Sequence, residues 1–326
     1  MTTDRRITAV VETFPVAGTF TIARGARTQA TVVVVTVTDG THVGRGECVP
    51  YPRYGETIDS VCAQIAAAGD IADRATLHAR LPPGAARNAF DCALWDLDAR
   101  RSGRTVADLA GLATPALPQL TCYTLSLGRP DAMADAARAA ADRPLLKLKL
   151  GGDGDAERMR AVRAARPDAR LVADANEAWR VAHLEDLLAV AAETGMEMIE
   201  QPLPTAEEAA LAGIARPVPI CADESVHTAR DLPRLAGLYD AINVKLDKAG
   251  GLTEAVELAR AARARNLEVM VGCMLSTSLA MAPALLLAPF ADWLDLDGPL
   301  LLARDREPAI RYDGGHIVDV PAGLWG

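Results

Sequence analysis

The sequence has no long apolar run and no cluster of basic residues, and each absence argues against a class of function. No hydrophobic stretch approaches the roughly 20 residues that a helix needs to cross a bilayer. The first six residues carry charges with no apolar core behind them, so no secretory signal is expected. The 326 residues have a formal net charge of -9 without a Lys/Arg patch, so we do not expect nucleic acid as a partner.

The six cysteines are scattered along the chain, and none belongs to a Cys-x-x-Cys pair. Isolated cysteines among apolar neighbours are usually small buried hydrophobic residues in a reducing compartment. We therefore expect no disulfide framework and a cytoplasmic location.

A repeating pattern of short apolar runs occupies the centre of the sequence. Five such runs end on charged residues, and stretches with helical periodicity separate them. This alternation is typical of βα units around a buried parallel sheet. In a (β/α)8 barrel the catalytic groups lie at the C-terminal ends of the strands, where the loops open to solvent. The runs are residues 145–149, 171–174, 198–200, 220–224 and 241–245.

We predict an α/β protein with two domains. Residues 1–118 are predicted to form an α+β capping domain, completed by residues 300–326, and residues 119–299 to form the barrel. Residues 20–27 combine glycine with exposed arginines and are predicted to be a mobile loop. The first barrel strand is predicted at residues 120–127. The segments that indicate the capping domain are the β-rich residues 7–16, 30–38, 42–48 and 311–320 and the helical residues 57–68 and 85–101.

Three acidic residues follow successive predicted strands. Asp174, Glu200 and Asp223 are 26 and 23 residues apart, one βα unit each, so they should lie on adjacent strands. Converging carboxylates repel one another unless a cation lies between them. Oxygen ligands without nearby cysteine or histidine favour Mg²⁺ over zinc. Any one of these acids alone could be a helix cap or a solvated charge.

Lysines lie on two of the predicted strands. Lys147 and Lys149 are two residues apart and therefore point to the same face of a strand whose other residues are leucines. Inward lysines at a barrel mouth are costly unless paired or functional. Lys245 ends a strand across the barrel, whereas Lys248 already belongs to the following loop. An amine on each side of a carbon acid can remove a proton from one face and return it to the other, which is an epimerase geometry.

These residues belong to a set of motifs that resembles a known family. In this order and over the whole chain, the motifs resemble the muconate-lactonizing subgroup of the enolase superfamily. The resemblance implies a (β/α)7β barrel with an N-terminal cap and one Mg²⁺ on the three carboxylates. It also implies Lys149 and Lys245 as acid/bases. The motifs are Lys147-x-Lys149, Asp174-Ala-Asn176, Glu200-Gln201-Pro202, Asp223-Glu224-Ser225 and Asn243-Val-Lys245 with Gly250-Gly251.

The reaction within the subgroup is suggested by Asp295 and Asp297. Both lie on the same face of the eighth strand, where they could bind a free substrate ammonium. The segment resembles the Asp-x-Asp motif of dipeptide epimerases, and the loop with Ser276 resembles the L-Ala-D/L-Glu epimerases among them. A solvated strand end is the alternative for the two acids.

Other residues are assigned supporting roles. Arg24 could clamp a second substrate carboxylate, and Arg53 and Tyr54 are weaker candidates. Lys147 is counted with the substrate-binding residues. Asn176 and Glu224 are assigned as partners of the metal site and a lysine. His227 is expected to be a surface residue rather than a ligand.

We therefore predict a Mg²⁺-dependent dipeptide epimerase that inverts the α-carbon of the C-terminal residue, with L-Ala-L-Glu and L-Ala-D-Glu as substrates. The resemblance implies recycling of murein peptides. The alternatives are an N-acylamino acid racemase, an o-succinylbenzoate synthase, or a dipeptide epimerase of other specificity. A non-catalytic binding barrel is a further alternative. No membrane partner is expected, and a homo-oligomer is left open.

Overall fold

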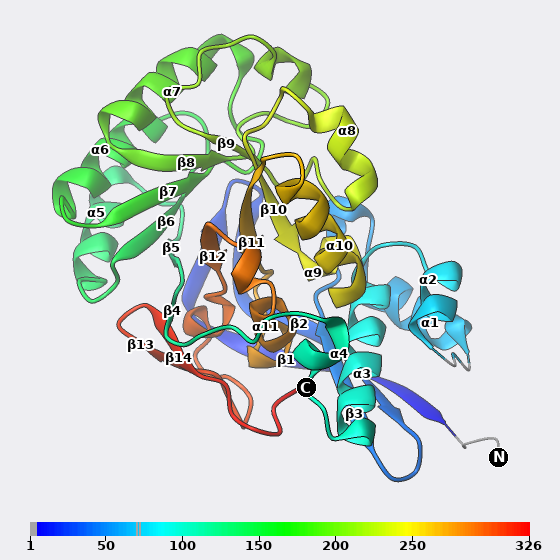
Figure 1. The fold of residues 1–326 in the computed structure, drawn as a ribbon. Helices are drawn as coiled ribbons and strands as arrows, with labels where there is room; N and C mark the ends of the chain where they lie inside the picture. The colour runs from blue at the N-terminus through cyan, green and yellow to red at the C-terminus, as the bar shows by residue number, and fades with distance from the viewer. Residues whose placement is uncertain (1–4, 70, 72) are drawn as a thin grey trace.

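A computed structural model describes residues 5–69, 71 and 73–326 of the chain (Figure 1). Residues 1–4, which open the segment assessed for a secretory signal, lie outside the described residues. Among the described helices, none combines the length and apolar character needed to cross a membrane. The chain forms an N-terminal domain of antiparallel strands and helices beside a parallel barrel, so the predicted fold class is confirmed.

The N-terminal domain packs helices against one face of a three-stranded antiparallel sheet. Its strands are β1 (Arg6–Ile22), β2 (Gly25–Thr38) and β3 (Val43–Cys48), in the order β1-β2-β3. Its helices are the 3-10 helix η1 (Pro52–Tyr54), α1 (Ile58–Ala68), α2 (Arg74–Arg80), α3 (Ala85–Ser102) and α4 (Val106–Ala110). Val33 and Val35 of β2 pack with the helices, whereas Val32 and Val34 join the main core. Both faces of β2 are buried, as its almost continuous run of valine requires.

Helix α3 lies directly on β3 because two glycines leave room for its backbone. A Cβ atom on Gly44 would come within 2.1 Å of the Ala93 carbonyl oxygen, and one on Gly46 within 2.1 Å of the Ala89 oxygen. Real Cβ contacts are never this short, so the helix would have to move away from the sheet.

We expect Gly44→Ala to lower the free energy of unfolding by about 1–3 kcal/mol, the usual cost of overpacking. Urea denaturation monitored by circular dichroism measures the change. Gly128→Ala is the matched control, because its Cβ would meet only ordinary contacts of 3.6 Å or more. Equal stability of the two variants would show that the α3–β3 contact is not as tight as described.

The barrel sheet runs in the order β5 to β12, and all its pairings are parallel. Its strands are β5 (Tyr123–Leu125), β6 (Leu145–Lys149), β7 (Arg170–Asp174), β8 (Met196–Glu200), β9 (Ile220–Ala222), β10 (Ala241–Lys245), β11 (Glu268–Gly272) and β12 (Trp293–Asp295). Just before β5, the amide of Cys122 donates to the Leu294 carbonyl at 2.8 Å, which brings the two edges of the sheet together. The barrel is therefore nearly closed.

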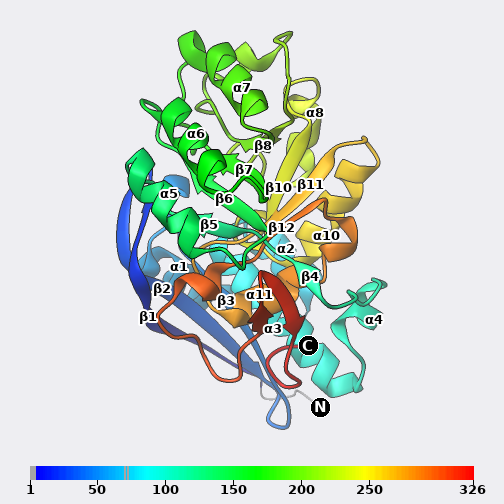
Figure 2. The same cartoon turned by 90° about the vertical axis from the view of Figure 1, so that its left-hand side faces the viewer.

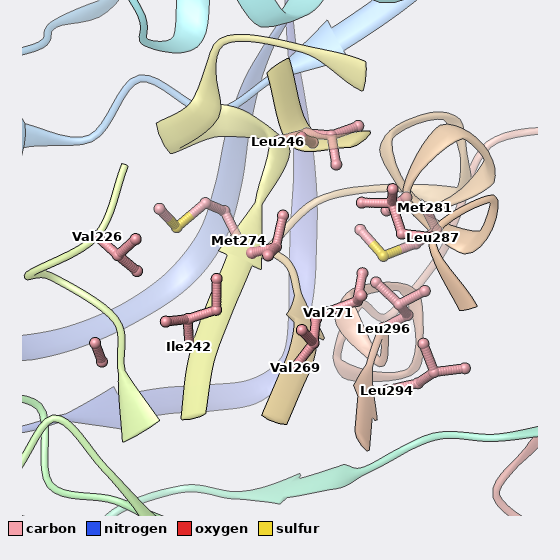
Figure 3. Close-up of a cluster of buried hydrophobic side chains, with 14 of the residues drawn as sticks. Val226, Ile242, Leu246, Val269, Val271, Met274, Met281, Leu287, Leu294 and Leu296 are labelled. Atoms are coloured by element: carbon pink, nitrogen blue, oxygen red, sulfur yellow. The ribbon is translucent and has the colours of Figure 1, made fainter. Parts of the chain in front are cut away.

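Helices cover the outside of the barrel between successive strands (Figure 1). The helical segments that connect β5 to β12 are α5 (Pro130–Ala139), α6 (Asp155–Ala165), η2 (Val181–His183), α7 (Leu184–Glu193), η3 (Glu208–Leu211), η4 (Ala229–Asp231), α8 (Leu232–Leu235), α9 (Leu246–Ala249), α10 (Leu252–Arg263), α11 (Ser278–Leu285) and η5 (Ala288–Phe290), of which α9 lies at the barrel mouth against α3. The connection from β8 to β9 carries only a short 3-10 helix. Figure 3 shows part of the main apolar core, to which Val269 and Val271 of β11, Leu294 of β12 and Met281 of α11 all contribute.

Alternation along the strands separates the barrel interior into two layers. The lower layer is an apolar cluster to which each strand region contributes one residue: Cys122, Leu145, Val172, Met198, Cys221, Ala241, Met270 and Trp293. Two residues further along, the same faces carry polar groups, because side chains on one face of a strand repeat every second residue. This upper layer contains Lys147, Asp174, Glu200, Asp223, Asn243 and Asp295.

Two predicted boundaries are wrong. Residues 20–27 are not a loop, because β1 and β2 continue to a tight turn at residues 23–24 and pair from Phe20 to Arg27. Residues 120–127 are not one strand. β4 (Gln119–Leu120) pairs with the C-terminal β14 (His316–Asp319), which also pairs with β13 (Arg311–Asp313), and only β5 belongs to the barrel.

Buried polar contacts attach the N-terminal domain to the barrel mouth. Asp247 accepts hydrogen bonds from the Val49 amide at 2.9 Å and the Asn88 side chain at 3.0 Å. Glu47 accepts one from the Thr277 amide at 2.8 Å. Figure 2 shows the β1–β2 hairpin rising along the barrel. The C-terminal segment, after η6 (Gly298–Leu301), returns to this domain.

Candidate active site

Three buried carboxylates converge at the C-terminal ends of β7, β8 and β9. Ligand atoms of Asp174, Glu200 and Asp223 all lie within 4.8 Å of one another. Burial and the charge of Asp174 raise the pKa of Glu200. Burial alone would also raise the pKa of Asp223, but Lys245 and Lys248 hold it well below its usual range. Negative charge is thus concentrated where three strands end.

The surroundings of these carboxylates fit a hard divalent cation. All three ligands offer oxygen, and the described part of the chain brings no histidine or cysteine into the cluster. Five buried oxygen acceptors at the site have no hydrogen-bond partner among the described residues, although Glu200 Oε2 is ion-paired with Lys147: Asn176 Oδ1, Glu200 Oε2, Glu224 Oε2, Asn243 Oδ1 and Asp295 Oδ1. The site offers acceptors in excess of donors, which suits a cation and a cationic ligand.

The chain contains only four lysines, and all four lie buried around this cluster. Lys149 Nζ donates to Asp174 at 2.6 Å, and Lys245 Nζ donates to Asp223 at 2.6 Å. Arginine supplies every other non-histidine basic side chain. Lysine differs from arginine in carrying a compact ammonium and in being able to give up its proton, so this usage indicates that the site needs one or both of these properties.

The four lysines differ in what they can reach. Lys149 and Lys245 line a cavity of about 470 Å³, together with Asn176, Asp223 and Glu224. Lys147 and Lys248 do not line it. Lys248 donates to the Asn243 carbonyl at 3.0 Å and to Asp223 at 2.6 Å. Lys248 lies in helix α9 rather than in the loop predicted for it, and its contacts hold Asp223 from outside the cavity.

Lys147 lies between two acidic groups beneath the cavity. Its Nζ is 2.6 Å from Glu200 and 2.5 Å from Asp295. Burial would lower the pKa of Lys147, but Asp295 and Glu200 raise it well above its usual range. Lys147 is therefore a fixed cation that connects the carboxylate cluster to β12, and its position does not place it against a ligand in the cavity.

Asp295 and Asp297 both lie at the barrel mouth, but they have different partners. Asp295 pairs with Lys147, whereas Asp297 accepts a hydrogen bond from the Thr124 amide at 2.6 Å. Burial and the charge of Asp295 raise the pKa of Asp297 to about 7. Cys273 lines the cavity, and both acids add to the effect of burial in raising the pKa of its thiol. Neither carboxylate lines the cavity itself, but both lie close enough to Cys273, which does, to act on its thiol.

Ser276 is not brought to the cavity. Its hydroxyl is fully buried and donates to the Met274 carbonyl at 2.9 Å. It shapes the loop whose residues Met274 and Leu275 line the cavity.

Arg24 reaches across the cavity from the β1–β2 turn. Its guanidinium donates to Glu224 at 2.7 Å and to the Asn176 carbonyl at 3.0 Å. Burial and the charges of Asp223 and Asp174 raise the pKa of Glu224 to about 7, although Arg24 opposes this. Asn176 donates its amide groups to Asp174 at 2.8 and 2.9 Å. The structure thus brings Arg24, Asn176 and Glu224 together above the metal site.

Two further residues take part in the site without having been assigned a role from the sequence. Asn243, which the sequence places in the motif Asn243-Val-Lys245, donates to Glu200 at 2.7 Å. Glu177 forms a bidentate pair with Arg53, with both distances 2.7 Å. His227 is half-buried rather than a surface residue, with its ring 4.6 Å from that of Tyr54.

Comparison with known families matches both domains. The family described as "Mandelate racemase / muconate lactonizing enzyme, N-terminal domain" matches residues 5–111. The family described as "Enolase C-terminal domain-like" matches residues 132–323.

Individual relatives match nearly the whole chain. An L-Ala-D/L-Glu epimerase of Escherichia coli is 47% identical over 96% of this chain and 99% of its own. An N-acetyl-D-glutamate racemase of Pseudoalteromonas sp. is 42% identical over 90% of this chain and 95% of its own. A crystal structure of an enolase family member from Agrobacterium tumefaciens, with homology to dipeptide epimerases and bound sodium and L-Ala-L-Glu, has a TM-score of 0.95. It is 52% identical and covers 99% of this chain and 100% of its own.

Proposed function

The chain belongs to the mandelate racemase / muconate lactonizing enzyme family, and from this premise we propose that it is a Mg²⁺-dependent dipeptide epimerase. It inverts the α-carbon of the C-terminal residue, with L-Ala-L-Glu and L-Ala-D-Glu as the substrate pair. One observation carries the proposal: Lys149 and Lys245 line one cavity and flank the buried carboxylates of Asp174, Glu200 and Asp223.

The residues divide the reaction between charge stabilisation and proton transfer. Asp174, Glu200 and Asp223 would hold Mg²⁺, which would supply positive charge to stabilise the negative charge that develops when the substrate α-carbon loses a proton. Lys149 on β6 and Lys245 on β10 then act from different sides of the cavity, one removing the proton and the other returning a proton to the opposite face. The carbon inverts because the two faces have separate acid/bases.

Neighbouring side chains keep this machinery in place. Asn243 fixes one oxygen of Glu200, and Lys248 fixes one oxygen of Asp223. Gly272 makes room for Asn243, since a Cβ atom there would come within 2.4 Å of the Asn243 Oδ1 atom.

The named activities of the two relatives share a glutamate that is acylated on nitrogen. A dipeptide differs from N-acetylglutamate by its free ammonium, which needs a carboxylate partner. Asp297 is buried and has no cationic partner among the described residues, so we assign the ammonium to Asp297, with Asp295 beside it. This favours a dipeptide epimerase over the second candidate function, an N-acylamino acid racemase.

We expect Asp297→Asn to lower kcat/KM for L-Ala-L-Glu by about 10- to 100-fold, the loss of one charge-assisted hydrogen bond. The same variant should affect N-acetyl-L-glutamate much less, because that compound has no ammonium. Parallel kinetics on the two compounds measure the difference. Equal losses on both would favour the racemase.

The test of the function itself is proton NMR of L-Ala-L-Glu in D₂O with the protein and Mg²⁺. We expect the Glu α-proton signal to disappear and signals of L-Ala-D-Glu to appear. Exchange on another dipeptide only would change the substrate but keep the mechanism, and exchange on none would refute the proposal. We propose turnover of murein peptides in the cytoplasm as the setting, consistent with the six free cysteines.

A further inference from the structure

A short loop between β11 and α11 forms one wall of the cavity. Cys273, Met274 and Leu275 of this loop line it. Burial raises the pKa of the Cys273 thiol, and the charges of Asp295 and Asp297 add to this effect. Because we assign the substrate ammonium to Asp297, the loop borders the end of the cavity that receives the N-terminal residue of a dipeptide.

The end of this loop is held by a network of hydrogen bonds outside the cavity. Thr277 donates to Glu47 of β3 through its amide at 2.8 Å and through its hydroxyl at 2.5 Å. Arg306 donates from Nε to the Thr277 hydroxyl at 2.6 Å and from Nη2 to Glu47 at 2.5 Å. The same Nη2 atom lies 2.9 Å from a carboxylate oxygen of Glu12 on β1. Arg306 therefore joins two strands of the N-terminal domain to the loop that lines the cavity.

Arg306 supplies the positive charge on which this network depends. The Glu47 side chain is 0% exposed, and Arg306 is its only ion-pair partner among the described residues. Burial raises the pKa of Glu47, and Arg306 opposes this effect. An arginine donates from several N–H groups held in one plane, whereas a lysine is a single point charge. Replacing Arg306 by lysine therefore keeps a cation beside Glu47 but removes the fork that also holds Thr277.

Apolar contacts hold the middle of the loop against the same parts of the chain. Leu275 packs with a small cluster of Val16, Ala30 and Leu302, which combines β1, β2 and the C-terminal segment. Val16 and Leu302 also form an isolated antiparallel bridge, so the C-terminal segment is paired with β1 just before it reaches Arg306. The position of the cavity wall thus depends on the N-terminal domain and the C-terminal segment together.

We propose that Arg306 is a positioning residue that determines which N-terminal residue the dipeptide site accepts. Arg306, Glu47 and Thr277 do not line the cavity, so they act on a ligand through the loop of residues 273–277. A firmly held loop keeps the wall close to a small side chain, whereas a released loop gives way to a larger one. The proposal rests on the proposed dipeptide epimerase function and extends it to residues outside the cavity.

The test compares L-Ala-L-Glu with L-Leu-L-Glu, which differ only in the N-terminal side chain. In Mg²⁺-loaded Arg306→Lys we expect the ratio of their Kd values to shift in favour of L-Leu-L-Glu by about 2- to 30-fold, the range over which substitutions outside a binding site alter it. The Kd ratio between L-Ala-L-Glu and L-Ala-L-Gln should stay within about twofold, because these two differ at the C-terminal residue. Titration calorimetry measures all three affinities.

The rate of the chemical step provides a second measurement. The kcat for L-Ala-L-Glu, followed by α-proton exchange, should stay within about twofold of the wild-type value. Lys149 and Lys245 are held by strands of the barrel and not by the loop. A variant that merely lost part of its folded population would lower kcat and leave every Kd ratio unchanged.

Hydrogen exchange reports on the loop without any substrate. The amides of residues 273–278 should exchange about tenfold or more faster in Arg306→Lys, which corresponds to the loss of one hydrogen bond to a charged group. Arg166→Lys is the matched control. The Arg166 side chain is 7% exposed, close to the 11% of Arg306, and it pairs with Asp168 without lining the cavity. This control should change neither the affinity ratios nor the exchange of the loop.

A second variant acts on the loop rather than on the charge. Thr277→Val removes the hydroxyl that Glu47 and Arg306 both contact, whereas Thr277→Ser retains it. Valine should shift the affinity ratio in the same direction as Arg306→Lys, and serine should keep it close to the wild-type value. Because Glu47 keeps its cation in both, this pair still decides the question if Arg306→Lys does not fold.

The outcomes assign failure to one proposal or the other. Unchanged affinity ratios in the Arg306→Lys and Thr277→Val variants, or equal weakening of all three dipeptides, would overturn the role of Arg306 alone. If the wild-type protein binds L-Ala-L-Glu but does not invert it, the proposed reaction fails and the affinity ratios still decide the role of Arg306. If the wild-type protein binds none of the three dipeptides, both proposals fail.

Discussion

Lys149→Arg and Lys245→Arg are each expected to slow inversion of L-Ala-L-Glu by about 10²- to 10⁴-fold, the usual contribution of a general acid or base. Arginine keeps the positive charge but cannot give up its proton near neutral pH. The lysine left in each variant can still remove an α-proton from its own face and return a deuteron there. One diastereomer should therefore exchange its proton with D₂O without inverting, and the other should be inert.

Proton NMR on the separate L,L and L,D dipeptides reads out this pattern, and the two variants should act on opposite diastereomers. Unchanged circular dichroism and Mg²⁺ affinity would control for loss of the fold or the metal site. If either variant still exchanged both diastereomers at comparable rates, a single base would serve both faces, and the division of roles would be wrong.

The distribution of lysine and arginine along the chain also supports the division of roles between Lys149 and Lys245. A chain with only four lysines, all within the barrel mouth, uses arginine for its surface charges. Lysine is thus retained where a compact ammonium or a removable proton is needed. Lys147 and Lys248 serve as compact cations under the site. The ammonium group of Lys147 contacts carboxylates, and that of Lys248 contacts a carboxylate and a backbone carbonyl. Lys149 and Lys245 are the pair that reaches the cavity.

The barrel and its polar layer could be predicted from the sequence because they follow from local periodicity. Alternation along each strand places Asp174 two residues above Val172 and Glu200 two above Met198, which separates the apolar cluster from the site. Repetition of one βα unit then brings such residues together at one end of the sheet. Neither step requires knowledge of contacts between distant segments.

The rim of the cavity could not be predicted in the same way, because it forms between the two domains. The spacing of Arg24, Tyr51 and Glu177 along the chain has no period, and only the docking of the hairpin brings them together. Glycine and arginine in residues 20–27 suggested mobility, whereas thirteen paired positions hold β1 against β2. The rim of the cavity is therefore the part of the site that the sequence describes least.

Glu200→Gln is expected to weaken Mg²⁺ binding by more than about 100-fold. Removing a residue that only hydrogen-bonds to a metal ligand already lowers metal affinity or activity by roughly 10- to 100-fold, and loss of a ligand should cost more. The change keeps the shape of the side chain but removes one of three negative charges at the site. It also places an amide beside Lys147, a donor where the cation needs an acceptor. At a fixed Mg²⁺ concentration, activity should fall in proportion to the loss of bound Mg²⁺. Part of the activity should return when the Mg²⁺ concentration is raised.

Titration calorimetry of the protein stripped of metal measures the Mg²⁺ affinity directly, without reference to turnover. Asp295→Asn is the matched control, since Asp295 contacts the same Lys147 but lies outside the three-carboxylate cluster. Its Mg²⁺ affinity should stay close to that of the wild-type protein, because the charge it removes is not a ligand. Equal weakening in both variants would mean that the affinity depends on the summed charge around Lys147 rather than on coordination by Glu200.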